Sequence, residues 1–179
     1  MFFEKEGLKI EYKKCENKLP SSFWETYSAF ANTEGGTIIL GVDEKNGKFS
    51  VTGVQAPDRI VMDLFNQLND RKKVSYNVVS DSDVIIEEID NKSIIKVVVA
   101  EAFYENKPVY LKDNMRNTYI RLGEGDRQAS SEELKAFVVN SHNDIDDELL
   151  EGYDIDDINT DTLERYRRIL LNISEKNLK

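Results

Sequence analysis

The sequence has few of the residues that most often build chemical sites. A single cysteine, Cys15, excludes an intrachain disulfide, and with one histidine, His142, it cannot supply a zinc site of the usual cysteine and histidine kind. One histidine near the end of a predicted helix also leaves no serine, histidine and acid catalytic set. We expect Cys15 to be a buried, small hydrophobic residue and His142 to interact with a helix end.

Long apolar runs are absent as well. No stretch approaches the length that spans a membrane, and Met1-Phe2-Phe3 is followed at once by charged residues, unlike a signal peptide. We therefore expect a cytoplasmic protein. No GxxxxGK[ST] motif occurs, so the sequence gives no support for a phosphate loop that binds ATP.

Positive charge is also in short supply, and the net charge is −10. Residues 1–143 contain 19 Lys and Arg against 23 Asp and Glu, while residues 144–164 contain 10 acidic residues and no basic one. This balance argues against general coating of nucleic acid by the whole surface. Any contact with phosphate has to come from a local basic patch.

The apolar pattern of the 179 residues predicts one domain with an appendage. The expected fold class is α+β, a mixed and largely antiparallel sheet flanked by helices. We expect the domain to cover residues 1–143, followed by an acidic linker over 144–158 and an amphipathic helix over 159–179. Helices are predicted over 22–32, from 57 or 58 to 72, and from 130 or 131 to 139, and strands over 8–14, 37–42, 49–54, 74–79, 84–89, 94–100, 108–112 and 118–122.

The chain is organised around the turn between the first helix and the strand that follows it. Ser22 and Glu25 have the spacing of a capping box at the start of the helix. At its end, Asn32 and the pair Gly35-Gly36 are residue types that adopt left-handed backbone conformations at little cost. The glycine pair has two interpretations: a turn too tight for a Cβ, or a bare backbone that phosphate or sugar can approach.

This turn lies within the motif AFANTEGGTIILGVDE at residues 29–44, and further blocks follow a fixed order along the chain. The blocks are Glu6, Glu11-Tyr12-Lys13, Gly53-Val54, Pro108-Val109-Tyr110-Leu111, Tyr119-Ile120-Arg121-Leu122-Gly123 and Ala129-Ser130. Over about residues 4–140 the sequence resembles the Schlafen/AlbA-like DNA-binding domain family. The resemblance implies the nucleic-acid-binding domain of a bacterial transcriptional regulator, with DNA favoured over RNA and no cofactor.

Seven basic residues are candidates for contact with phosphate: Lys13, Lys14, Arg71, Lys72, Lys73, Arg121 and Arg127. In the resembled family, Arg121 would lead into a small loop rich in hydroxyl groups. Here Glu124 and Asp126 occupy that loop, and a carboxylate repels phosphate. Ion pairs from Arg121 and Arg127 to these acids are therefore favoured over phosphate binding.

A second hypothesis is a divalent-metal-dependent endoribonuclease. In Schlafen-type endoribonucleases three carboxylates form the catalytic cluster, and the resemblance places Glu6, Glu11 and Asp43 at those positions. They would bind Mg²⁺ or Mn²⁺, with Lys13 assisting from the same face of its strand as Glu11. The alternative for Glu11 and Lys13 is a solvated strand face that carries opposite charges.

A third hypothesis is an interaction module in which the motif is purely architectural. The amphipathic helix over 159–179 would then fold back or pack against a second subunit in a homodimer. Because family members commonly continue into a further domain, this helix is also compatible with the start of a further region.

Overall fold

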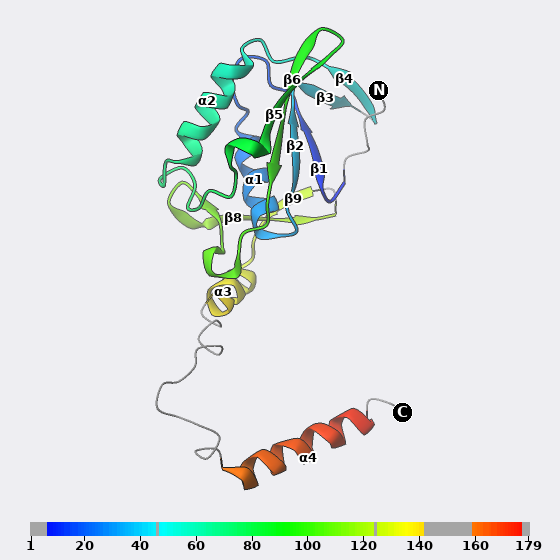
Figure 1. Cartoon of the computed structure of the whole chain (residues 1–179), viewed down its shortest axis with the longest axis vertical. Helices are drawn as coiled ribbons and strands as arrows, with labels where there is room; N and C mark the ends of the chain where they lie inside the picture. Colours follow the sequence, from blue (N-terminus) through cyan, green and yellow to red (C-terminus); the bar gives the residue numbers. More distant parts are fainter. Residues whose placement is uncertain (1–6, 46, 124, 142–158, 177–179) are drawn as a thin grey trace. The chain divides into compact units, whose positions relative to one another are not determined.

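The structure is a computed structural model that describes residues 7–45, 47–123, 125–141 and 159–176, with only the backbone described over 169–176 (Figure 1). Two compact units, Met1–Asn143 and Asp144–Lys179, are described separately below. The described helices and strands are β1 (Ile10–Lys13), α1 (Ser22–Asn32), β2 (Gly36–Leu40), β3 (Val42–Lys45), β4 (Lys48–Val51), α2 (Pro57–Leu68), β5 (Val84–Ile89), β6 (Lys92–Val99), β7 (Tyr110–Leu111), β8 (Asn114–Leu122), β9 (Gly125–Gln128), α3 (Ser131–Asn140) and α4 (Thr160–Lys176).

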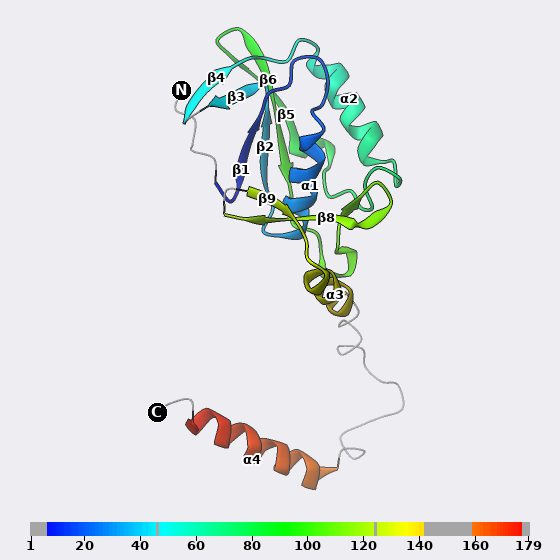
Figure 2. The same ribbon diagram turned by 180° about the vertical axis from the view of Figure 1, so that it is seen from behind.

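The sheets confirm the predicted α+β class. The main sheet has the strand order β1-β2-β6-β5, in which β1 and β2 are parallel and the other neighbours are antiparallel. Strands β3 and β4 form a separate hairpin, and β7, β8 and β9 form a third, antiparallel sheet. Figure 2 shows β8 crossing one end of the main sheet, beside α1.

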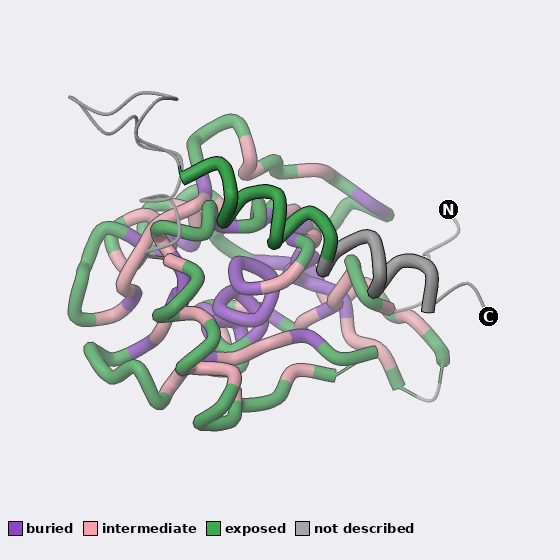
Figure 3. The backbone as a smooth tube through the Cα atoms, turned by 90° about the horizontal axis from the view of Figure 1, so that it is seen from below, coloured by how far each residue is buried: buried purple, intermediate pink, exposed green. Residues whose placement is uncertain are grey.

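Helices α1 and α2 lie against one face of the main sheet (Figures 1 and 2). Nine of the eleven residues of α1 are buried, so the helix forms the centre of the unit, as the buried turns in Figure 3 show. Phe23, Tyr27 and Phe30 from α1 pack with Ile38 and Leu40 from β2. Burying large aromatic side chains of this kind is the main stabilising contribution to a core of this size.

A smaller apolar cluster lies on the opposite face of the sheet. Tyr12, Ile39 and Ile94 contact the β3–β4 hairpin, where the rings of Tyr12 and Phe49 have centroids 4.8 Å apart. Asp43, which follows the strand predicted over 37–42, lies within β3 of this hairpin.

The glycine pair supports the interpretation of a turn too tight for a Cβ. Gly35 has a φ of +70°, and a Cβ on it would lie 2.8 Å from the carbonyl oxygen of Val99. A Cβ on Gly36 would lie 2.7 Å from the ring of Phe30. The space beside the bare backbone is therefore filled by the protein itself.

Asn32 has a different role from the one the sequence suggested. It is the last residue of α1 and has no positive φ. Its buried side-chain amide accepts the N–H of Val109 at 2.7 Å and donates to the carbonyl oxygens of Val109 at 2.8 Å and Tyr119 at 3.0 Å. Asn32 thereby joins the end of α1 to β8 and to the segment that leads into β7.

The predicted bounds of α1 are confirmed, but its predicted cap and the predicted end of α2 need correction. Helix α1 is capped at Ser21, which makes no side-chain cap hydrogen bond, so Ser22 and Glu25 do not form a capping box. Helix α2 ends at Leu68 instead of residue 72, because Asp70 accepts the N–H of Lys72 and stabilises a turn in place of another helical turn.

The strand predicted over 74–79 is replaced by a single bridge between Val74 and Leu111. The buried hydroxyl of Tyr27 donates to the carbonyl oxygen of Tyr76 at 3.1 Å and accepts the N–H of Val78 at 2.9 Å. A side chain from α1 thus satisfies backbone groups that a neighbouring strand would otherwise bind. Burial also raises the pKa of Tyr27, so its hydroxyl stays protonated and can donate.

Helix α3 starts as predicted, because Ser130 and Glu133 form a capping box. His142, Glu6, Glu124 and the acidic linker over 144–158 lie outside the described residues. In the second unit, α4 exposes Leu163 and Tyr166. Among the described helices, none is long and apolar enough to cross a membrane.

Candidate nucleic-acid interface

Arg121 on β8 lies inside the protein, with only 2% of its side chain exposed. Its guanidinium forms ion pairs with Glu11 on β1 at 2.8 Å and with Asp126 on β9 at 2.7 Å, and it donates to the carbonyl oxygen of Gly7 at 2.7 Å. The guanidinium also lies 5.0 Å from the centre of the Phe30 ring. Arg121 therefore connects three segments from within and is not a surface contact.

The two carboxylates that bind Arg121 also have other hydrogen-bond partners. Burial by itself lowers the pKa of Arg121, but the hydrogen bonds and charges of Asp126 and Glu11 outweigh burial and raise it. Asp126 also accepts the hydroxyl of Thr26, and the second oxygen of Glu11 accepts the ammonium of Lys13 at 2.9 Å. The predicted pair between Arg121 and Asp126 is therefore present, with Glu11 as an additional partner.

Two further basic candidates are paired at the surface. Lys14 contacts Glu16 at 2.9 Å, and Arg127 binds both carboxylate oxygens of Glu133, at 2.9 and 2.6 Å. Arg127 thus pairs with the first turn of α3, and the described acid of the preceding loop, Asp126, pairs with Arg121 instead. With Lys13 and Arg121, four of the seven candidates already have a carboxylate partner.

The other three, Arg71, Lys72 and Lys73, lie together after α2, and we call them the basic cluster. Arg71 donates to the carbonyl oxygen of Ser75 and lies 5.8 Å from the ring of Tyr76. The ammonium of Lys73 lies 4.9 Å from the ring of Trp24. Within the described part of the chain, none of the three forms an ion pair with a carboxylate.

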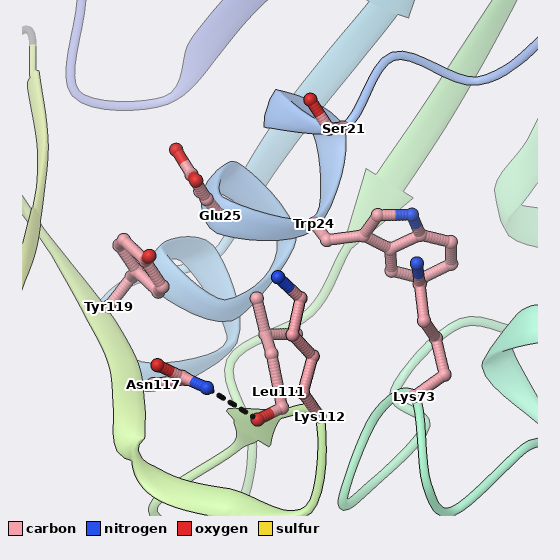
Figure 4. A pocket seen from close by; sticks show the side chains of 8 residues that line it. All are labelled: Ser21, Trp24, Glu25, Lys73, Leu111, Lys112, Asn117 and Tyr119. Atoms are coloured by element: carbon pink, nitrogen blue, oxygen red, sulfur yellow. Dashed lines mark hydrogen bonds between the residues drawn. The ribbon is translucent and has the colours of Figure 1, made fainter.

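A pocket of about 100 Å³ opens beside the basic cluster, between α1 and the β7–β8 sheet (Figure 4). Lys73 lies on its rim with Lys112, whose backbone N–H donates to the carbonyl oxygen of Lys73 at 3.0 Å. Trp24 and Tyr119 supply aromatic walls, and Glu25 and Asn117 supply polar ones. The pocket therefore combines cations, rings and hydrogen-bonding groups.

Sequence reasoning missed the residues of this pocket other than Lys73. Lys112 lies beside Lys73 because the chain at β7 pairs with the segment that follows α2. No local sequence pattern predicts that pairing. Trp24 is the only tryptophan of the chain and is 4% exposed, so the apolar periodicity of α1 could have identified it as part of the buried face.

Two of the three carboxylates of the nuclease hypothesis are described. Both oxygens of Glu11 contact cationic side chains, and Asp43 pairs with Lys45 at 3.0 Å. Glu6 lies outside the described residues. Within residues 7–45, 47–123, 125–141 and 159–176, no group of three or more His, Cys, Asp or Glu side chains is arranged to hold a metal ion.

Comparisons with known proteins give a consistent result. A family model described as Schlafen, AlbA_2 matches residues 6–130. The N-terminal domain of a Nitrosomonas europaea protein related to the ATP-dependent DNA helicase RecG is 26% identical, with a TM-score of 0.51 over 72% of this chain and 86% of that one. A Corynebacterium diphtheriae protein is 18% identical, with a TM-score of 0.51 over 73% of this chain, and it shares the fold. This chain spans only 23% of the length of that protein. A search of the curated proteins found no match.

Proposed function

The chain belongs to the Schlafen AlbA_2 family, and from this we propose that it is a DNA-binding domain of a transcriptional regulator that contacts DNA through the basic cluster. The basic cluster comprises Arg71, Lys72 and Lys73, which follow α2. Phosphate contacts supply most of the affinity in sequence-independent binding, so a few accessible cations are sufficient for a measurable interaction.

The observation that carries the proposal is the uneven distribution of free positive charge. Lys13, Lys14, Arg121 and Arg127 are neutralised by neighbouring carboxylates, and a phosphate would have to displace those partners. Arg71 and Lys72 are exposed and lack such partners among the described residues. Because the whole molecule is acidic, this patch is where an attraction for DNA can exceed the general repulsion.

The comparisons support DNA as the nucleic acid. The Nitrosomonas europaea domain belongs to a protein related to a DNA helicase, and it covers nearly the same part of the fold as the present domain. Membership of the Schlafen AlbA_2 family also favours a nucleic-acid-binding role.

The test is a fluorescence anisotropy titration of labelled duplex DNA with the protein and its Lys72→Ala variant at several salt concentrations. Lys72→Ala should weaken binding and reduce the slope of log affinity against log salt by about 1, as expected for one lost phosphate contact. Lys14→Ala is the matched control, since it removes the same charge from a lysine that already pairs with Glu16. Equal effects of the two substitutions would contradict a specific role for the basic cluster.

The endoribonuclease hypothesis can be tested in the same samples. Structured RNA is incubated with the protein in Mn²⁺ and in EDTA, with Glu11→Gln alongside. The contacts of Glu11 with Lys13 and Arg121 favour an ion-pairing role, so we expect a salt-sensitive shift without cleavage. Cleavage that requires metal and disappears in Glu11→Gln would instead support the metal site of Glu6, Glu11 and Asp43.

A further inference from the structure

The pocket beside the basic cluster has unpaired positive charge at its rim. Neither Lys73 nor Lys112 forms an ion pair with any residue that the structure describes. Their backbones are hydrogen-bonded at 3.0 Å, which keeps the two side chains next to each other. The pocket also opens beside Ser21, at the N-terminus of α1, where the helix dipole adds positive potential. An anion is therefore the expected ligand of the rim.

The net charge of the pocket indicates which anion fits. Besides the two lysines, Glu25 is the only acidic residue among the residues that line it, so the lining carries a net charge of about +1. Burial, and then the charge of Glu25, raises the pKa of the Tyr119 hydroxyl. A single positive charge matches a phosphodiester, which carries one negative charge, better than a phosphomonoester with nearly two.

The interior of the pocket suits a planar base. Its volume of about 100 Å³ compares with roughly 10–15 Å³ needed for one water. Tyr119 is half-buried and presents part of its ring, while Trp24, which is only 4% exposed, has its ring centre 4.9 Å from the ammonium of Lys73 (Figure 4). Glu25 and Asn117 add polar groups to the lining, and the amide of Asn117 donates to the carbonyl oxygen of Leu111 at 3.3 Å (Figure 4). Stacking on aromatic rings beside a cationic groove is how proteins hold unpaired strands.

We propose that this pocket accepts one unpaired nucleotide of a DNA strand, with its phosphodiester on Lys73 and Lys112 and its base against Tyr119, close to Trp24. The inference rests on the proposed function, because Lys73 belongs to both the basic cluster and the rim. Lys73 directly follows Arg71 and Lys72 in the chain and also lines the pocket, so the basic cluster extends to its rim. A base within a duplex stays stacked and cannot enter.

The tryptophan of the pocket provides a specific readout, since Trp24 is the only tryptophan in the chain. The full chain is titrated with a labelled single-stranded DNA and with a blunt-ended duplex of two complementary strands of the same length, following label anisotropy and Trp24 emission together. We expect both DNAs to raise the anisotropy and only the single strand to change the emission of Trp24. Free deoxynucleoside monophosphates at the same nucleotide concentration should leave the emission unchanged.

Two variants test whether the preference for single-stranded DNA arises in the pocket. Lys112→Gln should weaken binding of the single strand about tenfold and leave binding of the duplex within about twofold, while Trp24 reports the same melting temperature as in the parent protein. Arg116→Gln removes the same charge from the same hairpin outside the pocket and should affect both DNAs equally.

The possible failures are distinguishable. If both DNAs raise the anisotropy but neither, or both equally, changes the emission of Trp24, the pocket proposal is overturned and the proposed function stands. If free mononucleotides change the emission at the concentration where the strand does, the pocket takes a free nucleotide and the strand assignment is wrong. If no DNA raises the anisotropy, both the proposed function and this inference fail.

Discussion

Arg121 shows how much can depend on one buried charge. Replacing it with alanine would leave the carboxylate of Asp126, which is 13% exposed, without its cation, and Glu11, which is 16% exposed, with Lys13 alone. We expect Arg121→Ala to lower the free energy of unfolding by about 3–5 kcal/mol, because an uncompensated charge remains in the interior. Urea denaturation followed by Trp24 fluorescence measures the change.

Arg127→Ala is the control for this experiment. It also removes an arginine that pairs with a carboxylate, but the pair with Glu133 lies at the surface, where water screens the charges. Its effect on stability should be far smaller than that of Arg121→Ala. Similar midpoints for the two variants would show that the buried pair contributes no more than an exposed one.

Cys15 gives a second prediction about a single side chain. The residue is 2% exposed, its thiol donates to the carbonyl oxygen of Lys18 at 3.3 Å, and burial raises its pKa to about 11. The thiol should therefore react very slowly with Ellman's reagent at pH 8 in the folded protein and completely in denaturant. Release of one equivalent of product from the native protein at the rate of free cysteine would contradict this burial.

The two glycines of the turn between α1 and β2 can be compared with Gly47, which lies between β3 and β4. Gly47→Ala places a Cβ at a φ of +73° with no atom within 4 Å, so it measures backbone strain alone, about 1–2 kcal/mol. Gly36→Ala meets the ring of Phe30 and should cost about 1–3 kcal/mol through overpacking. Gly35→Ala combines strain with a backbone contact and should be the most destabilising. Thermal unfolding of the three variants ranks their melting temperatures. An unchanged melting temperature for Gly35→Ala would refute the inference that this turn has no room for a Cβ.

The start of α3 should be sensitive to acid. The hydrogen bond from Arg127, and then the backbone N–H of Ser130, lower the pKa of Glu133 from 4.5 to about 2. The ionised side chain therefore stabilises the folded state fully above pH 4.5, and this contribution is lost as the pH falls towards 2. The stability difference between the parent protein and Glu133→Gln should shrink over that range, and a difference independent of pH would contradict the ion pair.

Local signals explain why some elements could be predicted from the sequence. The cap of α3 and the hairpin of β5 and β6 are encoded by neighbouring residues, and the structure contains both. The predicted strand over 74–79 failed because Tyr27, which lies far away in the sequence, binds its backbone. The same limit applies to the site: Asp126 is near Arg121 in sequence and was expected, whereas Glu11 and Lys112 come together with their partners only through the fold.

The charge of the whole chain leads to a prediction about DNA affinity. Residues 144–179 hold 11 of the 34 acidic residues and 5 of the 24 basic ones, so they make the molecule considerably more negative. Removing them should tighten DNA binding by the unit Met1–Asn143 at low salt, and the gain should disappear as added salt shortens the screening length. Anisotropy titrations at several salt concentrations measure this, and equal affinities at low salt would exclude a long-range effect of the acidic segment.

The hydrogen bonds of α1 also have a consequence for the order in which the protein folds. Thr26 bonds to Asp126, Ser28 accepts the N–H of Tyr119, and Asn32 bonds to Val109 and Tyr119, over sequence separations of 77 to 100 residues. The polar side chains of α1 therefore find their partners in strands that are synthesised long after the helix. Closing such long loops slows folding, and a nascent chain that ends before β9 still leaves Thr26 without its partner Asp126. We therefore expect the domain to reach its native state only after β9 has been synthesised, and to depend on chaperones until then.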